Sequence, residues 1–169
     1  MQSCSKLRIA SVTLSGLALL CVPTSAQVLL ARTTKATHNV FIEGYARTDD
    51  KCESIDPPTV YVDKPPKHGI VCFRSADLRL RTTVENNLAH CLGRSAHGIH
   101  VIYAPRAGYA GPDTVRYTVR FPKTQHTVDV ILTVLPDDRQ PSGATPGGPF
   151  IGDVSQTPGP LPVCTALVS

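Results

Sequence analysis

The sequence predicts an all-β protein, a single antiparallel sandwich of about seven short strands, and three observations support this. Apolar and polar residues alternate along several short runs, which is typical of strands with one buried face. The 169 residues include 15 Pro, 12 Gly and no Trp. This composition favours strands and turns, because a proline costs about 3 kcal/mol inside a helix. Finally, no stretch of the sequence has sustained helical periodicity.

Residues 1–26 are expected to be a cleaved export signal. Lys6 and Arg8 give a positive start, residues 9–22 are mostly apolar, and small residues leading to Ala26 supply a cleavage site. The apolar run is short for a membrane span. A lipid anchor on Cys21, or a retained anchor, is the open alternative. We therefore expect a periplasmic or secreted protein, with no transmembrane segment in the mature chain, in a compartment where disulfides persist.

The strands are expected within a domain at residues 37–136. Before the domain, residues 27–36 have an indistinct pattern and are expected to be frayed. The last run is the clearest, because Val128, Val130, Leu132 and Val134 share one face. The other face of that run is mixed, with Ile131 and Leu135 among polar residues. The expected strands are 40–42, 59–62, 70–73, 78–84, 99–103, 115–121 and 127–135.

The composition changes abruptly after Pro136. Residues 137–169 contain six Pro and five Gly, which is typical of a flexible tail and not of a second domain. The end of this tail, at residues 161–168, is mildly apolar and carries Cys164. Docking of that end on the domain is the open alternative.

Two strands around a Pro/Gly turn, at residues 101–121, contain the most informative motif. Gly108 and Gly111 can supply the positive φ that tight turns need, and Asp113 can accept hydrogen bonds from nearby backbone amides. The motif has the spacing Y-x-P-x-x-G-x-x-G-x-D-x-x-x-Y, formed by Tyr103, Pro105, Gly108, Gly111, Asp113 and Tyr117.

This motif resembles the signature of bacterial Ig-like and cadherin-like domains. The P-x-x-G-x-V pattern at residues 66–71 and the V-D-V-I-L-T-V run at 128–134 are similar to strands of the same family. The resemblance covers residues 58–135. It implies an Ig-like sandwich in a short, exported, single-domain member, in which the signature residues are structural. It implies no activity.

Four cysteines follow the expected leader, and they allow three disulfide connectivities. Cys52 and Cys91 both lie in polar loops beside strands, so we expect them to pair. Closing a loop of about 40 residues stabilises a domain by roughly 4 kcal/mol in the chain-entropy treatment. Cys72 lies within a strand and is expected to be a buried free thiol, with pairing to Cys164 as the alternative.

Cys91, His97 and His100 have a C-x5-H-x2-H spacing, and zinc or copper accepts such ligands. A periplasmic metal-binding protein is therefore the alternative function. Two observations oppose it. An odd step along a strand places the two histidines on opposite faces, and the expected disulfide uses the same cysteine. We expect solvated histidines and no cofactor.

Arg79 and Arg81 share one strand face, and Arg116 and Arg120 share another. If these strands are neighbours, the arginines form a surface that can contact carboxylates, phosphates or anionic glycans. An ordinary polar outer face is the other interpretation.

The net charge of +4 is well short of the concentrated basic field of a nucleic-acid binder. The sequence offers no catalytic motif on a defensible scaffold, so we do not expect an enzyme. The expected function is that of an exported non-catalytic module, which binds an unknown protein or glycan or serves as a cell-envelope accessory.

Overall fold

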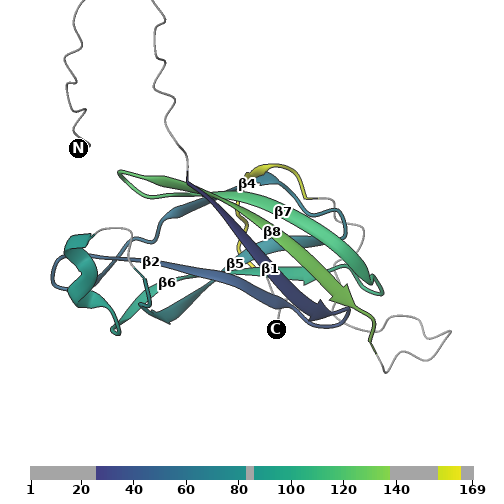
Figure 1. Ribbon diagram of the computed structural model, residues 1–169, viewed down its shortest axis with the longest axis horizontal. Coiled ribbons are helices and arrows are strands. Elements are labelled where there is room, and N and C mark those ends of the chain that lie inside the picture. Colours follow the sequence, from purple (N-terminus) through teal and green to yellow (C-terminus); the bar gives the residue numbers. More distant parts are fainter. Residues whose placement is uncertain (1–25, 83–85, 138–155, 165–169) are drawn as a thin grey trace, which may run out of the picture.

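The computed structural model describes residues 26–82, 86–137 and 156–164 (Figure 1). The expected export signal, apart from Ala26, lies outside these residues, as do segments 138–155 and 165–169 of the expected tail. The described part contains nine strands and one short 3-10 helix, η1 (Asn86–Cys91). The strands are β1 (Ala26–Lys35), β2 (Val40–Thr48), β3 (Ser54–Ile55), β4 (Thr59–Lys64), β5 (Gly69–Arg79), β6 (Ser95–Pro105), β7 (Gly111–Arg120), β8 (Gln125–Leu135) and β9 (Gly159–Pro160).

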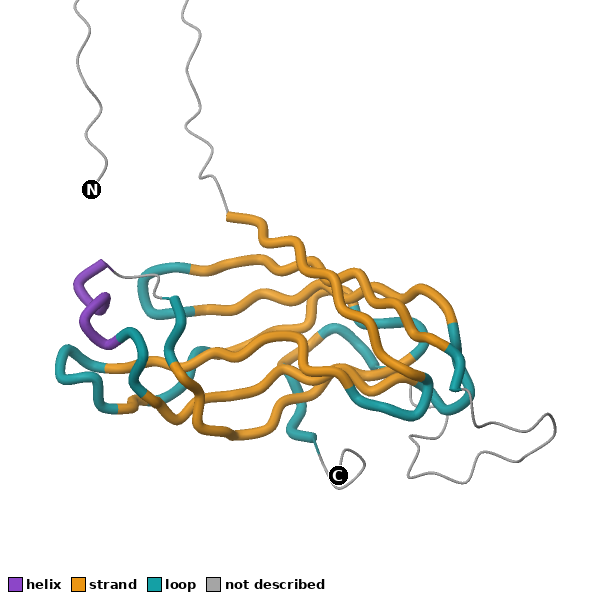
Figure 2. The backbone as a smooth tube through the Cα atoms, turned by 60° about the horizontal axis from the view of Figure 1, so that its bottom comes forward, coloured by secondary structure: helices purple, strands orange, loops and turns teal. Residues whose placement is uncertain are grey.

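The strands form two sheets whose long strands run along the long axis of the molecule (Figure 2). The first sheet has the order β1-β8-β7-β4-β9, and the second has the order β3-β2-β6-β5. The pairing of β1 with β8 is parallel, whereas the other pairings between these strands are antiparallel. An all-β protein with mostly antiparallel strands is thereby confirmed.

One apolar core lies between the two sheets, as in a sandwich. The alternation expected for residues 115–119 and 128–134 is present, because every second residue of these runs is buried. The second sheet contributes its own inward residues to the same cluster. The largest fully buried members are Ile42, Val62, Val71, Val101, Tyr103, Val115, Tyr117, Val119, Val128, Val130, Leu132 and Val134.

Two of the expected strand boundaries are wrong. Residues 27–36 are not frayed, because β1 pairs with β8 along its whole length and Leu30 packs against the core. The separate strands expected at 70–73 and 78–84 are one strand, β5, which ends at Arg79. The polar residues between them remain in the sheet because β6 pairs with β5 without interruption.

The expectation of a flexible tail is wrong for residues 156–164. Strand β9 pairs with β4, and Val163 forms a bridge with Phe73 of β5. Leu161 is only 6% exposed and belongs to the core cluster. Burial of the Leu161 side chain is favourable and stabilises the docked conformation of this Pro-rich segment. No helix among the described residues is long and apolar enough to cross a membrane.

Candidate functional site

The signature residues gather at a corner where β6 and β7 meet the turn before β5. Asp113 of β7 is buried and accepts hydrogen bonds from the backbone N–H groups of Lys67 (3.0 Å), His68 (2.8 Å) and Thr114 (2.8 Å). The hydroxyl of Tyr103 in β6 lies 3.0 Å from Asp113 Oδ2 and 3.2 Å from the carbonyl oxygen of His68. These bonds connect the two sheets, so this "β6–β7 corner" is a structural site.

The turn at this corner requires its glycines. Gly108 has φ +71° and Gly111 has φ +141°, conformations that residues with a Cβ rarely adopt. Pro105 ends β6 and pairs with Gly69 at the start of β5. A Cβ on Gly69 would lie 2.5 Å from the carbonyl oxygen of Ala104. Positive φ therefore accounts for Gly108 and Gly111, and close packing accounts for Gly69, without a ligand.

Tyr117, the last signature residue, forms a buried pair with Tyr45 of β2. Their hydroxyl oxygens are 3.0 Å apart. Burial raises the pKa of Tyr117 far above its usual range and raises the pKa of Tyr45 to about 12. Burial, together with the nearby Asp113, also raises the pKa of Tyr103. All three phenols stay neutral at physiological pH, as expected of side chains that hold the sheets together.

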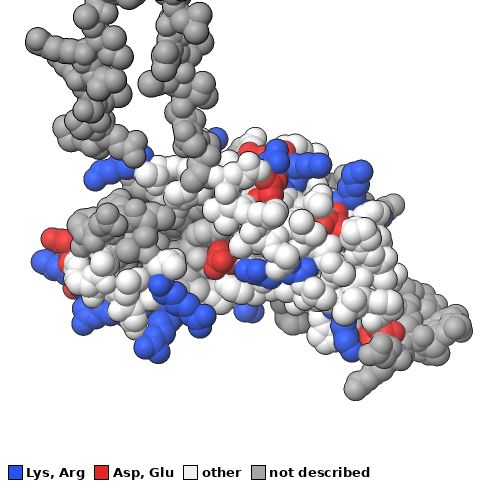
Figure 3. Space-filling model, in the orientation of Figure 1, with Lys and Arg blue, Asp and Glu red and all other residues white. Residues whose placement is uncertain are grey.

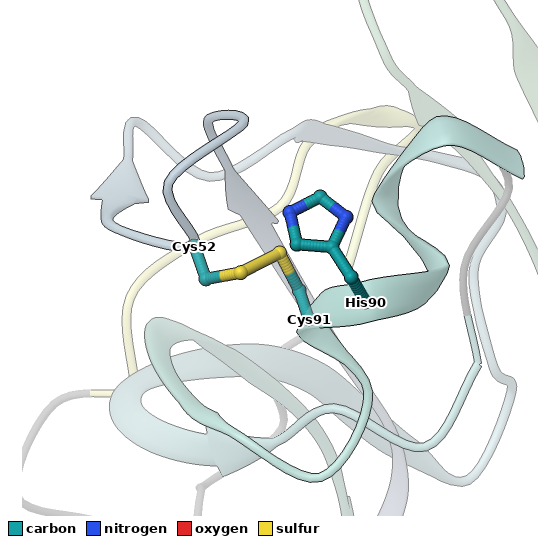
Figure 4. Close-up of side chains that lie close together, drawn as sticks. All are labelled: Cys52, His90 and Cys91. Carbon is teal, nitrogen blue, oxygen red and sulfur yellow. A yellow bond between two sulfur atoms is a disulfide. The ribbon is translucent and has the colours of Figure 1, made fainter.

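Cys52 and Cys91 are joined by a disulfide, with an S–S distance of 2.08 Å, which is the pairing that the sequence favoured. His90 places its ring beside this bond (Figure 4), and its Nε2 lies 2.8 Å from the carbonyl oxygen of Asp50. The possible ligand atoms of Cys52, His90 and Cys91 lie within 4.8 Å of one another. Since both sulfur atoms are in a disulfide, neither is a thiolate that could bind a metal.

The structure does not bring Cys91, His97 and His100 together. His97 contacts Asp77 in β5, with 3.2 Å between Nδ1 and Oδ1. His100 packs against Phe41 of β2, with their ring centroids 4.7 Å apart. Burial, and to a smaller extent Arg74, lowers the pKa of His100. Each histidine has its own neighbours, as expected for two positions an odd step apart on one strand.

A second disulfide joins Cys72 of β5 to Cys164. The prediction of a free Cys72 thiol is therefore wrong. The physical reason is the docking of residues 156–164, which brings Cys164 to the edge of the second sheet.

The four arginines do not form one surface. Arg79 ends β5 in the second sheet and Arg81 follows it, whereas Arg116 and Arg120 lie on β7 in the first sheet. Arg116 also forms an ion pair with Asp129, 2.6 Å between Nε and Oδ1, and Arg120 lies over the ring of Tyr61. The expected arginine surface depended on β5 and β7 being neighbours, which they are not.

The outer face of β1 and β8 carries exposed apolar side chains instead. Leu29 is 68% exposed, Ile131 47% and Leu135 44%. The register pairs Leu29 with Asp129, Ala31 with Ile131 and Lys35 with Leu135, so all of these side chains share the face opposite the core. We call this surface the β1–β8 face, with Leu29, Ala31, Ile131 and Leu135 as its apolar members. Figure 3 shows mostly uncharged atoms over β1 and β8, with charged side chains among and beside them.

Sequence reasoning missed this face because it treated residues 27–36 as frayed. The available signal was the mixed outer side of the last strand, where Ile131 and Leu135 replace the polar residues usual on a solvated face. Its significance depends on Leu29, which reaches the same face only through the parallel pairing of β1 with β8.

No protein-family model and no curated protein matches the chain. Among solved structures, the solution structure of amebosin is similar to 66% of this chain and 98% of that chain, at 11% identity and a TM-score of 0.32. A likeness at this level supports no conclusion about fold or function.

Proposed function

We propose that the protein is an exported, non-catalytic binding module, and that it binds a partner protein through the β1–β8 face. The observation that carries this proposal is the exposure of Leu29, Ile131 and Leu135 on one side of one sheet. Single exposed leucines are common in folded proteins, but several exposed apolar side chains on one sheet face are typical of interaction sites, and here Thr33 and Thr133 separate Leu135 from the other members. The ion pair of Arg116 with Asp129 lies on the same side and supplies a polar border.

The backbone of β1 adds a second means of recognition. Within the described residues β1 is an edge strand, with β8 on one side. An edge strand presents N–H and C=O groups to which an extended segment of another protein can pair. Such a segment would gain main-chain hydrogen bonds from β1 and apolar contacts from Leu29, so affinity and register would come from one surface.

The fold in this proposal follows from the sequence resemblance and the compartment from the expected export signal, and several features agree with them. The β6–β7 corner and the Tyr45–Tyr117 pair account for the signature residues by structural contacts, as an Ig-like sandwich of this family would require. Two disulfides suit an oxidising compartment outside the cytoplasm. A periplasmic or secreted location would place the β1–β8 face among envelope or extracellular proteins.

Other partners have less support. Binding of an anionic glycan would require the four arginines to share one surface, but they lie on two different sheets. A metal ion depended on a thiolate at Cys91, whose sulfur is bonded to Cys52. A role as a cell-envelope accessory would use the same β1–β8 face.

Site-specific photo-crosslinking in the native compartment tests the proposal. A photoreactive residue at position 29 or 131 should give a discrete protein adduct, identified by mass spectrometry. Leu92 is 44% exposed but lies just after η1, so the same probe at position 92 is the matched control. Leu29→Asp should reduce the adduct formed at position 131 at least tenfold while leaving the thermal midpoint unchanged. Equal labelling at positions 29, 92 and 131, or none at 29 and 131, would contradict the proposal.

A further inference from the structure

Residues 156–164 lie between the open edges of the two sheets. The N–H of Leu161 donates to the carbonyl oxygen of Val60 in β4, at 2.9 Å. The N–H of Phe73 in β5 donates to Pro162 at 2.9 Å, and the N–H of Cys164 donates back to Phe73 at 2.8 Å. Because β4 belongs to the first sheet and β5 to the second, one short segment pairs with both.

The side chain of Gln156 extends this pairing along β5. Its Nε2 donates to the carbonyl oxygen of Val71 at 2.8 Å, and its Oε1 accepts from the N–H of Val71 at 2.9 Å. The primary amide thus mimics the two hydrogen bonds of a paired strand residue. The N–H and C=O groups of Val71 would otherwise need water as a hydrogen-bond partner, and the Gln156 amide takes that place.

The middle of the segment supplies an apolar side chain and restricts the backbone. Leu161 is buried in the core, whereas Val163, two residues later, is 61% exposed. Prolines occupy positions 158, 160 and 162. Since proline has no N–H and a fixed φ, these residues favour an extended chain that pairs through alternate residues.

These contacts define a binding slot between β4 and β5, with the backbone groups of Val60, Val71 and Phe73 as its polar walls and the site of Leu161 as its apolar base. We propose that this β4–β5 slot is a peptide-binding site for an extended Pro-Leu-Pro segment, and that residues 156–164 of a second copy of the chain can fill it. Two copies would then form a strand-exchanged dimer. This proposal is independent of the β1–β8 face.

A second copy is the occupant whose fit is already visible in the structure. Exchange would recreate each hydrogen bond described above, so its main cost is the entropy of association. Residues 138–155 connect the domain to the segment, and a chain of that length spans up to roughly 60 Å when extended. The covalent connection therefore permits the segment to reach the slot of a neighbouring molecule as well as its own.

The disulfide between Cys72 and Cys164 would fix whichever arrangement forms first. In the exchanged dimer, Sγ of Cys72 in one copy bonds to Sγ of Cys164 in the other. The two thiols lose two protons and two electrons, and a small-molecule disulfide such as oxidised glutathione accepts them and becomes two thiols. The Cys52–Cys91 disulfide takes no part.

A complementation experiment tests this directly. Neither Cys72→Ser nor Cys164→Ser can form the disulfide within one chain, but a mixture of the two variants can form it between chains. In a glutathione buffer, the mixture should give a covalent dimer by non-reducing electrophoresis and light scattering. The yield of covalent dimer should be at least tenfold above that of either variant alone, and peptide mapping should locate its bond at Cys72–Cys164. Absence of this cross-link would overturn the proposal.

Two matched variants distinguish a cross-link that forms after the segment binds in the slot from one that forms when two molecules collide at random. Leu161→Asp in the chain that carries Cys72→Ser should lower the cross-link at least tenfold, because a carboxylate cannot occupy the apolar base. Val163→Asp in the same chain should leave the yield unchanged, since Val163 is exposed. Equal yields from the Leu161→Asp and unmodified segments would show that the cross-link arises without binding in the slot.

The protein without substitutions provides a further test, whose result does not depend on whether a variant folds. Equal amounts of isotopically light and heavy protein are reduced, mixed, and reoxidised at low and high concentration. Cys72–Cys164 peptides with one light and one heavy half should appear and should increase with concentration. If the peptides are entirely light or entirely heavy at every concentration, the segment never leaves its own domain and the proposal fails.

Discussion

The β6–β7 corner and the C-terminal segment both join the two sheets, but they use very different stretches of the chain. At the corner, Tyr103 and Asp113 are close in sequence and meet across a tight turn. At the other joint, Cys72 and Cys164 are separated by 92 residues. The corner depends on a buried carboxylate and its donors, whereas the segment depends on one buried leucine, backbone pairing and a disulfide.

The difference shows how distance along the chain decides which kind of bond can hold two sheets together. The contact of Tyr103 with Asp113 closes a short loop, which costs little entropy, and this contact positions Asp113 to accept the more distant donors Lys67 and His68. A long loop costs more, and a covalent bond offsets that cost by constraining the unfolded chain. We therefore expect the two joints to respond differently to substitution.

The largest effect should come from removing the long-range disulfide. In the chain-entropy treatment, closing a loop of about 90 residues contributes about 4.6 kcal/mol and a loop of about 40 residues about 3.9 kcal/mol. Cys72→Ser with Cys164→Ser should therefore lower the free energy of unfolding slightly more than Cys52→Ser with Cys91→Ser. Urea denaturation of both double variants, with the remaining disulfide verified by thiol titration, measures the difference. A smaller loss at Cys72–Cys164 would show that residues 156–164 contribute little to holding the sheets.

A somewhat smaller effect should come from removing the carboxylate of the corner. Asp113→Ala leaves the N–H groups of Lys67 and His68 without their acceptor, and the hydroxyl of Tyr103 keeps only the carbonyl oxygen of His68. Such a loss costs about 3 kcal/mol, because several hydrogen bonds to one buried carboxylate are removed at once. Chemical denaturation of the disulfide-intact protein measures this loss.

Asp129→Ala is the matched control for this substitution. Asp129 also accepts hydrogen bonds, but from Arg116 at the surface. Surface ion pairs contribute little, so Asp129→Ala should destabilise the protein much less than Asp113→Ala. Similar losses in both variants would mean that the corner is no more important than a surface contact.

The turn of the corner was predictable from the sequence because its residues lie close together. The positive φ at Gly108 and Gly111 and the hydrogen bond from the N–H of Thr114 to Asp113 follow from residue type and local spacing, whereas the donors Lys67 and His68 come from a distant part of the chain. The inward faces of β7 and β8 follow from strict alternation. In these places one local pattern determines the structure.

Other features depend on contacts between distant parts of the chain. Strand β1 lacks clear alternation, and its order depends on pairing with β8 and on contacts of Leu30 and Arg32 with residues outside the strand. Cys72 and Cys164 meet only when the segment docks on β4 and β5. The arginine surface failed for the same reason, since the sequence does not state which strands share a sheet. The β1–β8 face was missed because it combines residues from the two strands of such a pair.

The smallest effect should come from the hydroxyl of Tyr103. Tyr103→Phe removes one donor but leaves the three backbone donors to Asp113 in place. The free energy of unfolding should fall by about 1 kcal/mol near pH 8. Urea denaturation measures this loss, and one as large as that of Asp113→Ala would indicate damage to packing beyond the hydrogen bond.

The same variant should also change how stability depends on alkaline pH. Burial raises the pKa of Tyr103 above the value near 10 of an unfolded tyrosine. Its contribution is therefore complete below about pH 10 and declines above it, because the unfolded chain loses the proton first. Each such tyrosine lowers the free energy of unfolding by about 1.4 kcal/mol per pH unit in that window. Tyr45 and Tyr117 act in the same direction, so Tyr103→Phe should reduce the slope above pH 10 and not abolish it. An unchanged slope in urea denaturation between pH 10 and 11 would mean that Tyr103 titrates alike in both states, and that the corner admits water.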